Sequence, residues 1–385
     1  METADVVIIG AGIVGASIAF HLTETGCNNV LMIERETQQG KGSTGKSMGG
    51  VRAQFATPES IRMSLYSIPV FRDFESIVGG PSGYRAQGYL FVATSDRQLT
   101  YLRTNHERQA SLGLKDAAIL RPDDVMRLIP QLRADDIVGG SFCATDGFVD
   151  PYSVMMGFTA RAVERGARLW RGVTVTGIRV DAKGVAGVET TNGFAASRAV
   201  VNAAGAWAGA VARLAGVELP VEPLRRMLLP TEPFDKIAHS APMTVDLATG
   251  FHFRPEGLGL LMAWHDPHDV YGFNTDFDPA FVEKVLTRAV SRVPCLETAE
   301  VNPRRGWAGL YEMTPDHHPV LGEAPEVRGL WLANGFSGHG VMHSPAAGHI
   351  LAGLILKGSS DLIDTRTFSL SRFAEGRLIE ETAIL

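Results

Sequence analysis

A glycine-rich turn between an apolar strand and a helix is the feature that most restricts the fold of this chain. The run DVVIIG at residues 5–10 predicts a strand buried on both faces, and AGIVGASIAFHL predicts a helix directly after it. The turn reads Gly10-Ala-Gly12-Ile-Val-Gly15, and Glu34 ends the next apolar run about 20 residues further on. In such a turn the first glycine permits the sharp bend, the second admits a pyrophosphate to the backbone, and the third lets the helix pack on the strand. The sequence therefore predicts a dinucleotide site in which Glu34 accepts hydrogen bonds from a ribose.

A second glycine-rich string suggests a different nucleotide. Residues 40–47 read GKGSTGKS, and Gly40, Gly45, Lys46 and Ser47 satisfy the phosphate-loop pattern of nucleoside triphosphatases. That pattern requires a strand immediately before it and a helix immediately after it. The preceding apolar run ends several residues too early, and the sequence GGVRAQ is a poor helix start because glycine disfavours the first turn. We therefore interpret this string as a loop that does not bind ATP or GTP.

The acid at Glu34 and the position of the motif narrow the choice of dinucleotide. A carboxylate at this place disfavours a phosphorylated ribose, which argues against NADP even though Arg35 is adjacent. The motif alone does not distinguish NAD from FAD. Its position at residue 10, and the lack of a second G-x-G-x-x-G for a nicotinamide cofactor, favour FAD.

Composition argues against several other classes of function. The net charge of −6 leaves no basic stripe for nucleic acid, and three widely spaced cysteines offer no zinc or redox pair, so we expect neither a nucleic-acid partner nor a metal. The N-terminus lacks the basic segment and cleavage site of an export signal, and we expect a cytoplasmic protein. The apolar stretches are too short for a membrane span.

Strands typical of an α/β protein recur at the start, middle and end of the chain, with β-rich segments between them. We therefore predict an α/β (α+β) fold, in which a Rossmann-type dinucleotide-binding domain is interleaved with a β-sheet-rich substrate domain. The expected dinucleotide-binding domain comprises residues 1–80, 145–220 and 305–360. The expected substrate domain comprises residues 81–144 and 221–304, and residues 361–385 form a C-terminal tail. Ser344 and Pro345 predict the first turn of a helix that ends near residue 356.

Six sequence blocks carry a resemblance that extends over nearly the whole chain. In order they are GAGIVGASIAFHL, IERE, GSTGKSMGGVR, VTVTGI with VNAAGAWA, FHFRPEG, and YEMTPDHHPVLG with FSGHGVMHSPAAG. With these blocks the chain resembles the D-amino-acid oxidase superfamily of flavoproteins. Within it, the chain is most similar to the branch of sarcosine oxidase, dimethylglycine dehydrogenase and the proline dehydrogenase β subunit.

The glycine turn and the resemblance together imply a large set of FAD contacts. The string GSTGKSMGGVR would run beside the pyrophosphate and the flavin ring, Val175 would meet the adenine, and the FSGHG turn would lie under the flavin. The implied cofactor residues are Gly10, Gly12, Ile13, Val14, Gly15, Glu34, Arg35, Ser43, Thr44, Lys46, Ser47, Gly49, Gly50, Val175, Ala203, Ala204, Gly205, Trp207, Gly338, His339, Gly340, Val341 and Met342.

The resemblance also implies the reaction and its residues. The family oxidises an amine beside a carboxylate, by hydride transfer to flavin N5, and the resulting imine hydrolyses. Arg52 matches the arginine that binds the substrate carboxylate, while Tyr311 and His265 match active-site positions. Phe253 and Trp264 are candidate walls of an aromatic cage for the amine.

The family's second cation, a lysine, corresponds here to Met342. His343 and Arg254 are possible replacements, and the sequence favours neither.

Three departures from the family pattern bear on the flavin. The cysteine and the histidine through which some relatives attach flavin covalently correspond to Gly309 and Lys46, so we expect non-covalent FAD. The lysine that activates dioxygen corresponds to Leu261, which predicts a dehydrogenase with an electron acceptor other than, or besides, dioxygen.

Several alternatives remain open at the level of sequence. The substrate could be of the sarcosine, dimethylglycine or proline type. The protein could act alone or within a homo- or hetero-oligomer. A flavoprotein with reduced catalysis that serves as an assembly or scaffold subunit is the alternative function.

Overall fold

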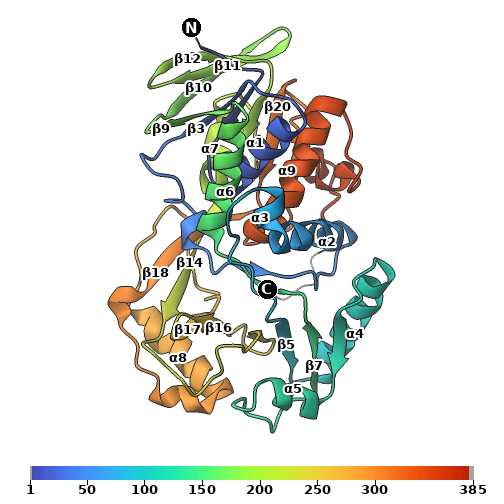
Figure 1. Cartoon of the computed structure of the whole chain (residues 1–385), viewed down its shortest axis with the longest axis vertical. Coiled ribbons are helices and arrows are strands. Elements are labelled where there is room, and N and C mark those ends of the chain that lie inside the picture. The colour runs from blue at the N-terminus through green and yellow to red at the C-terminus, as the bar shows by residue number, and fades with distance from the viewer. Residues whose placement is uncertain (1, 381–385) are drawn as a thin grey trace.

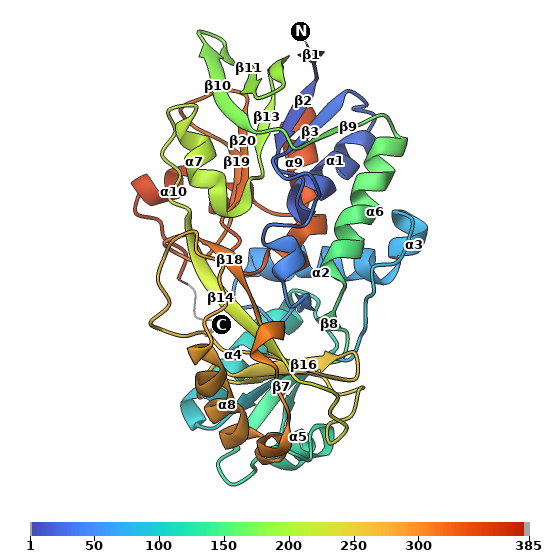
Figure 2. The same cartoon turned by 90° about the vertical axis from the view of Figure 1, so that its left-hand side faces the viewer.

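The structure is a computed structural model that describes residues 2–380 of the chain. The chain forms two lobes, one built on a mostly parallel sheet and the other on a larger, mainly antiparallel sheet (Figure 1). Two long strands, β14 (Glu222–Pro230) and β18 (Trp307–Met313), run side by side from the first lobe into the second (Figure 2). Segments from the beginning, middle and end of the chain meet in the first lobe, so the predicted interleaved α/β fold is confirmed.

The first lobe is centred on a six-stranded sheet. Apart from one antiparallel edge strand, all neighbouring strands are parallel. In spatial order, the strands are β19 (Val320–Glu323), β20 (Leu330–Asn334), β13 (Val200–Asn202), β2 (Val6–Ile9), β3 (Val30–Glu34) and β9 (Arg168–Arg171). Every residue of the VVII run in β2 is buried, because other layers cover both faces of the sheet.

Helices cover one face of this sheet and a second sheet covers the other. Helix α1 (Ile13–Glu24) packs against α6 (Pro151–Glu164) and α9 (Gly340–Lys357), and α2 (Pro58–Arg72) packs against α9. On the other face, α7 (Ala208–Arg213) and a four-stranded sheet share an apolar core with β2 and β3. The strands of this sheet are β1 (Glu2–Thr3), β12 (Gly193–Ala196), β11 (Gly184–Thr190) and β10 (Val175–Asp181).

The second lobe is centred on an eight-stranded sheet. In spatial order, its strands are β18, β14, β17 (Gly259–Ala263), β16 (His252–Glu256), β15 (Met243–Asp246), β5 (Tyr89–Ala93), β7 (Gly139–Cys143) and β6 (Ala117–Leu120). A separate two-stranded sheet pairs β4 (Gly50–Val51), which precedes α2, with β8 (Gly147–Phe148), which precedes α6. Strand β18 pairs with β14 along its whole length, so the eight-stranded sheet extends to Met313. Residues 307–313 therefore belong to this sheet, although the sequence places them in the dinucleotide-binding domain.

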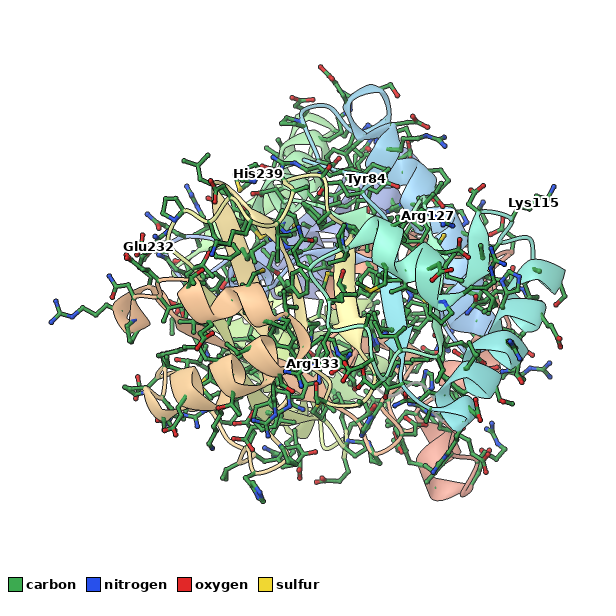
Figure 3. The ribbon with its side chains drawn as sticks, turned by 90° about the horizontal axis from the view of Figure 1, so that it is seen from below. Tyr84, Lys115, Arg127, Arg133, Glu232 and His239 are labelled. Atoms are coloured by element: carbon green, nitrogen blue, oxygen red, sulfur yellow. The ribbon has the colours of Figure 1, made fainter. Side chains whose placement is uncertain are left out.

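Short helices complete the second lobe. Helix α8 (Ala280–Arg292) and helix α5 (Pro122–Leu128) pack on one face of the eight-stranded sheet, and α4 (Asp96–Ser111) packs at the other. Figure 3, seen from below, shows α8 (orange) and the α4–α5 segment (teal) toward opposite edges of the sheet, with Arg133 beside α8. The Arg133 backbone N–H donates to the carbonyl of Arg292, which joins the α5 segment to the end of α8. Because α4 packs mainly on β5, β6 and β7, the rest of the face on which it packs can line a cavity.

Helix α9 starts earlier than the sequence predicts. It begins at Gly340, with His339 as N-cap, and Pro345 lies inside it. The expected N-cap at Ser344 is wrong: its hydroxyl donates instead to the carbonyl of Val341, within the first turns. Pro345 is the sixth residue of α9 and has no N–H to donate to the Val341 carbonyl four positions earlier. The Ser344 hydroxyl donates to this carbonyl at 2.8 Å and so replaces the missing backbone bond. The true helix start therefore coincides with the FSGHG turn.

The C-terminal segment is anchored to the first lobe. Its short helix α10 (Ser371–Ala374) carries Arg372, whose side chain is fully buried against the carboxylate of Asp316 at 2.8 Å. The 361–380 part of the expected tail therefore contributes to the core, while residues 381–385 lie outside the described chain. Helix α3 (Phe74–Ile77) follows α2 and completes the helices of residues 2–380. Within that range, none of the helices combines the length and apolar character that a bilayer crossing requires.

Candidate active site

The turn between β2 and α1 has the geometry that a dinucleotide site requires. Gly10 adopts a φ of +99°, and a Cβ there would lie 2.4 Å from the carbonyl oxygen of Ala203. Gly12 is the N-cap of α1 and faces the cavity described below. At the end of β3, the Glu34 carboxylate accepts hydrogen bonds from the backbone N–H groups of Ala11 and Glu36. These bonds place the acid beside the glycine turn, as the sequence predicts.

The GKGSTGKS string forms an irregular loop that is fastened to both lobes. The Ile13 N–H donates to Thr44 Oγ1 at 3.1 Å, and Ser43 Oγ donates to the Leu310 carbonyl at 2.7 Å. Only one turn of 3-10 helix, Thr44–Lys46, occurs here, and extended backbone follows at Ser47. The helix that a phosphate loop requires is therefore missing at this place, and the loop crosses from α1 to β18.

One long cavity connects the glycine turn to the face of the eight-stranded sheet. Its volume is about 500 Å³. All the predicted cofactor residues except Gly15 and Gly49 line it, and so do Arg52, His265 and Tyr311. Near Glu34, the Arg35 guanidinium stacks on the Trp207 ring at 4.2 Å. Residues from six separate blocks of sequence therefore meet around one space.

The two exceptions have structural roles beside the cavity. A Cβ at Gly15 would lie 2.0 Å from the Gly10 carbonyl oxygen, so Gly15 lets α1 pack closely on the turn. Gly49 packs against the chain that follows β8, since a Cβ there would lie 2.4 Å from the carbonyl oxygen of Val149. Neither residue contributes to the cavity lining.

Arg52 is a buried cation at the end of the cavity that faces the second lobe. Its guanidinium lies 4.3 Å from the centre of the Phe55 ring and donates to the Gln54 carbonyl. It also lies 3.2 Å from His339 Nε2. Neither contact involves a carboxylate, and no ion pair of the described residues includes Arg52. An anion of a ligand can therefore take the remaining donors of this fork.

A hydrogen-bond network fixes the backbone around Arg52. The buried carboxylate of Asp146 accepts from the Ala53 N–H at 2.8 Å and from Gln54 Nε2 at 3.0 Å. Gln54 also accepts from Ser141 Oγ. Burial raises the pKa of Asp146 to about 7, although these hydrogen bonds oppose the shift.

Tyr311 and His265 face each other in the same part of the cavity. Their ring centres are 5.7 Å apart, and the His265 ring also meets His252 edge-on at 5.4 Å. Burial lowers the pKa of His265 well below its ordinary value, with smaller contributions from His252 and Arg226. Burial likewise lowers the pKa of His252 to about 4. These imidazoles are therefore neutral at pH 7. His252 Nδ1 donates to the Gly250 carbonyl at 2.9 Å, so His252 offers only the acceptor Nε2.

The expected cage walls Phe253 and Trp264 do not line the cavity. Both belong to the apolar core under α8, and Trp264 Nε1 donates to the Thr249 carbonyl. Adjacent residues of a strand point to opposite faces, so His252 and His265 occupy the cavity face in their place. The prediction that Phe253 and Trp264 wall the site is therefore wrong, whereas His265, predicted beside Trp264, does line the cavity.

The two proposed replacements for the family's second cation also lie outside the cavity lining. Arg254 donates to the carbonyls of Met48 and Pro255, and His343 pairs with Ser64 Oγ. A different cation, Arg226 on β14, does line the cavity. The sequence offered only a weak signal for it, a pair of arginines in the otherwise apolar run PLRRMLLP.

Glu312 is a further lining residue that the sequence analysis missed. Its Oε2 is buried and has no hydrogen-bond partner within residues 2–380. Burial raises the pKa of this carboxyl to about 7, and the backbone N–H groups of Gly335 and Phe336 oppose the shift. Glu312 therefore lies next to the start of α9. With a pKa of about 7, its protonated and ionised forms are both populated at neutral pH.

The lining residues fit an extended dinucleotide. The N-termini of α1 and α9 both open on the cavity, and helix N-termini favour negative charge, such as a diphosphate or a reduced flavin ring. Lys46 adds a cation to the cavity lining. Among the described residues, no group of three or more histidine, cysteine or acidic side chains is arranged to hold a metal ion.

The glycine turn, the acid after β3 and the long cavity define a dinucleotide-binding protein whose nucleotide reaches a second lobe. A family profile described as "DAO: FAD dependent oxidoreductase" matches residues 5–354. The chain therefore belongs to this family of FAD-dependent oxidoreductases, and FAD is its cofactor.

Individual relatives agree with this membership. "FAD-dependent oxidoreductase domain-containing protein 1" of Xenopus laevis is 31% identical over 97% of this chain and 83% of its own length. Mitochondrial sarcosine dehydrogenase of Mus musculus is also 31% identical over 97% of this chain, which spans 42% of that longer protein. The structure of L-proline dehydrogenase from P. horikoshii superimposes with a TM-score of 0.91 at 29% identity, covering 98% of this chain and all of that one.

Proposed function

We propose that this protein oxidises the C–N bond of a small secondary or tertiary amino acid. The observation that carries the proposal is Arg52, a buried guanidinium without a carboxylate partner, in the same cavity as the FAD-binding turn. Burying a cation without a carboxylate at ion-pair distance is costly, so Arg52 is best explained by a ligand anion that pairs with it. The relatives named sarcosine dehydrogenase and L-proline dehydrogenase support this substrate class without selecting one member.

The chain's own residues bind and orient the substrate. Arg52 holds the carboxylate, and Tyr311 and the neutral His265 form a wall of low charge around the amine. A wall of this kind favours an uncharged amine, whose nitrogen lone pair is free to form a C=N bond. When bound, FAD would supply the two-electron oxidation by accepting the hydride from the carbon next to nitrogen, and water would then hydrolyse the resulting imine or iminium to a carbonyl compound and an amine.

Non-covalent FAD is part of the proposal. A Cβ at Gly309 would lie 2.8 Å from the Cβ of Lys46, so the two positions that attach flavin in some relatives pack against each other here. Neither residue offers the sulfur or imidazole of those attachments. Acid precipitation should therefore release all flavin into the supernatant, and flavin that stays with the pellet would contradict this point.

Dehydrogenase activity is the other refinement that we propose. Leu261 is 1% exposed and belongs to an apolar cluster with Met48 and Ala263 below the cavity, where it supplies no charge to stabilise superoxide. We therefore expect slow reoxidation of the reduced protein by air and faster turnover with an artificial acceptor. Reoxidation by air within the time of mixing would refute this refinement.

Anaerobic bleaching of the bound flavin tests the main proposal. The purified holoprotein is mixed with a panel of N-methylated and cyclic amino acids, and absorbance in the flavin band is followed. We expect bleaching by at least one amino acid but not by its decarboxylated amine, because Arg52 requires the carboxylate. If no member bleaches a flavin that dithionite does reduce, the scaffold alternative replaces the catalytic one.

A further inference from the structure

A second cation lies at the opposite end of the same cavity wall from Arg52. Arg226 on β14 lines the cavity, and its guanidinium lies 5.6 Å from the centre of the Tyr311 ring. Its side chain is only 17% exposed. One of its five N–H donors is used by Asp269 at 3.0 Å, while its buried Nε has no partner among the described residues.

The register of the eight-stranded sheet shows how far apart the strands beside the two arginines lie. Leu228, Ala263, His252, Val245 and Phe91 are successive partners across β14, β17, β16, β15 and β5. Four steps between neighbouring strands span about 19 Å. Arg226 is two residues from Leu228 on the same face of β14, whereas the Arg52 guanidinium lies 5.4 Å from the Phe91 ring. Arg226 and Arg52 therefore lie near the two ends of this row of five paired residues, and His252 lies in the middle of the row.

Arg226 shares its carboxylate partner with a second arginine. Asp269 lies 3.0 Å from Arg226 and 4.0 Å from Arg225, so two guanidinium groups share one carboxylate. At the other end, no carboxylate of residues 2–380 forms an ion pair with Arg52. A substrate with one carboxylate, bound at about 3 Å from Arg52, leaves the buried Nε donor of Arg226 unused.

We propose that the preferred substrate carries a second carboxylate and that Arg226 binds it. The substrate class is then a secondary or tertiary amino acid with an acidic side chain or an N-carboxyalkyl group. Arg52 takes one carboxylate, Arg226 the other, and the reacting C–N bond lies between them beside His265 and Tyr311. This inference rests on the proposed amine oxidation and assigns Arg226 as the residue that determines specificity within it.

Matched substrate pairs test this assignment on the holoenzyme. Sarcosine is compared with N-(carboxymethyl)glycine, and N-methyl-L-alanine with N-methyl-L-aspartate, using an artificial electron acceptor. We expect the wild type to prefer the dicarboxylate of each pair. Arg226→Gln should lower kcat/KM for the dicarboxylates by roughly 10- to 100-fold, the effect of losing a charge-assisted hydrogen bond, and change the monocarboxylates less than about threefold.

Two further variants provide the controls. Arg226→Lys keeps the positive charge and should retain part of the dicarboxylate preference. Arg225→Gln removes the neighbouring arginine, which shares Asp269 but does not line the cavity, and should leave both classes near wild-type rates. Flavin content confirms that each variant folds.

The outcomes separate this inference from the proposed function. An equal loss on both substrate classes in Arg226→Gln, or a wild type without dicarboxylate preference, would overturn the inference and leave amine oxidation intact. If neither class reduces the flavin, the proposed function itself fails, and the inference fails with it.

Discussion

Replacing the buried Arg372 should destabilise the protein far more than replacing an exposed arginine in the same segment. Arg372 is 0% exposed and Asp316 is 1% exposed. The Arg372 side chain donates four hydrogen bonds: two to Asp316, one to the His318 carbonyl and one to the Ser369 carbonyl. Arg372→Met keeps most of the volume and removes all four, which leaves a buried carboxylate without its cation.

The expected cost is about 3–5 kcal/mol of unfolding free energy, the range for breaking a buried ion pair by removing one partner. Arg366, six positions before Arg372, provides the matched control. It also pairs with an aspartate, Asp364, but its side chain is 87% exposed. Arg366→Ala should cost about 0–1 kcal/mol. The double variant Asp316→Leu, Arg372→Met should be more stable than Arg372→Met alone, since no charge is then stranded.

Urea unfolding of the holoprotein at a fixed excess of FAD, followed by tryptophan fluorescence, measures these differences. The fixed concentration matters because bound FAD stabilises only the folded state. A cost for Arg372→Met below about 1 kcal/mol, equal to that of Arg366→Ala, would refute the claim that the C-terminal segment is anchored through this ion pair.

Three further predictions concern the cavity and its support. Gly10→Ala should abolish FAD retention, whereas the control Gly26→Ala should keep it. Both residues have positive φ, +99° and +93°, but only a Cβ at Gly10 meets a carbonyl oxygen. Flavin absorbance per mole of purified protein measures the difference. Arg52→Lys should lower kcat/KM roughly 100-fold at unchanged flavin content, because lysine lacks the bidentate fork; an unchanged KM and kcat would remove Arg52 from the site. The raised pKa of Asp146, about 7 against an ordinary 3.8, means that the folded state binds the proton more tightly, so stability should fall as pH rises between these values. From pH 5 to 8 the wild type should lose about 2.5 kcal/mol more than Asp146→Asn in urea unfolding, and parallel pH profiles would contradict this reasoning.

The glycine turn and the cofactor end of the cavity could be predicted from the sequence because the residues that form them are close together in the chain. Gly10, Gly12 and Glu34 follow from strand, turn and strand within one short segment, and the backbone itself makes the site. The resemblance extended this to residues far apart in sequence, and the structure brings Arg52, His265 and Tyr311 to the same cavity.

The substrate end was less predictable because it depends on strand faces and on pairing between distant segments. Period-2 alternation allows either set of residues to face the cavity, and only packing under α8 assigns Phe253 and Trp264 to the core. Arg226 reaches the cavity because β14 and β18 pair across about 80 positions of sequence. The start of α9 was misplaced because a serine followed by proline has the composition of a helix N-terminus wherever it occurs.

The contact between Lys46 and Gly309 has a consequence for how covalent flavin attachment can arise in a chain like this. With Cβ atoms that would lie 2.8 Å apart, the two positions constrain each other. A mutation that introduced a cysteine at position 309 would meet the backbone-proximal part of the lysine, and so would be deleterious until residue 46 or its loop had already changed. The order of substitutions is therefore restricted. Attachment of flavin through a cysteine at position 309 and attachment through a histidine at position 46 are alternatives that one lineage does not easily combine.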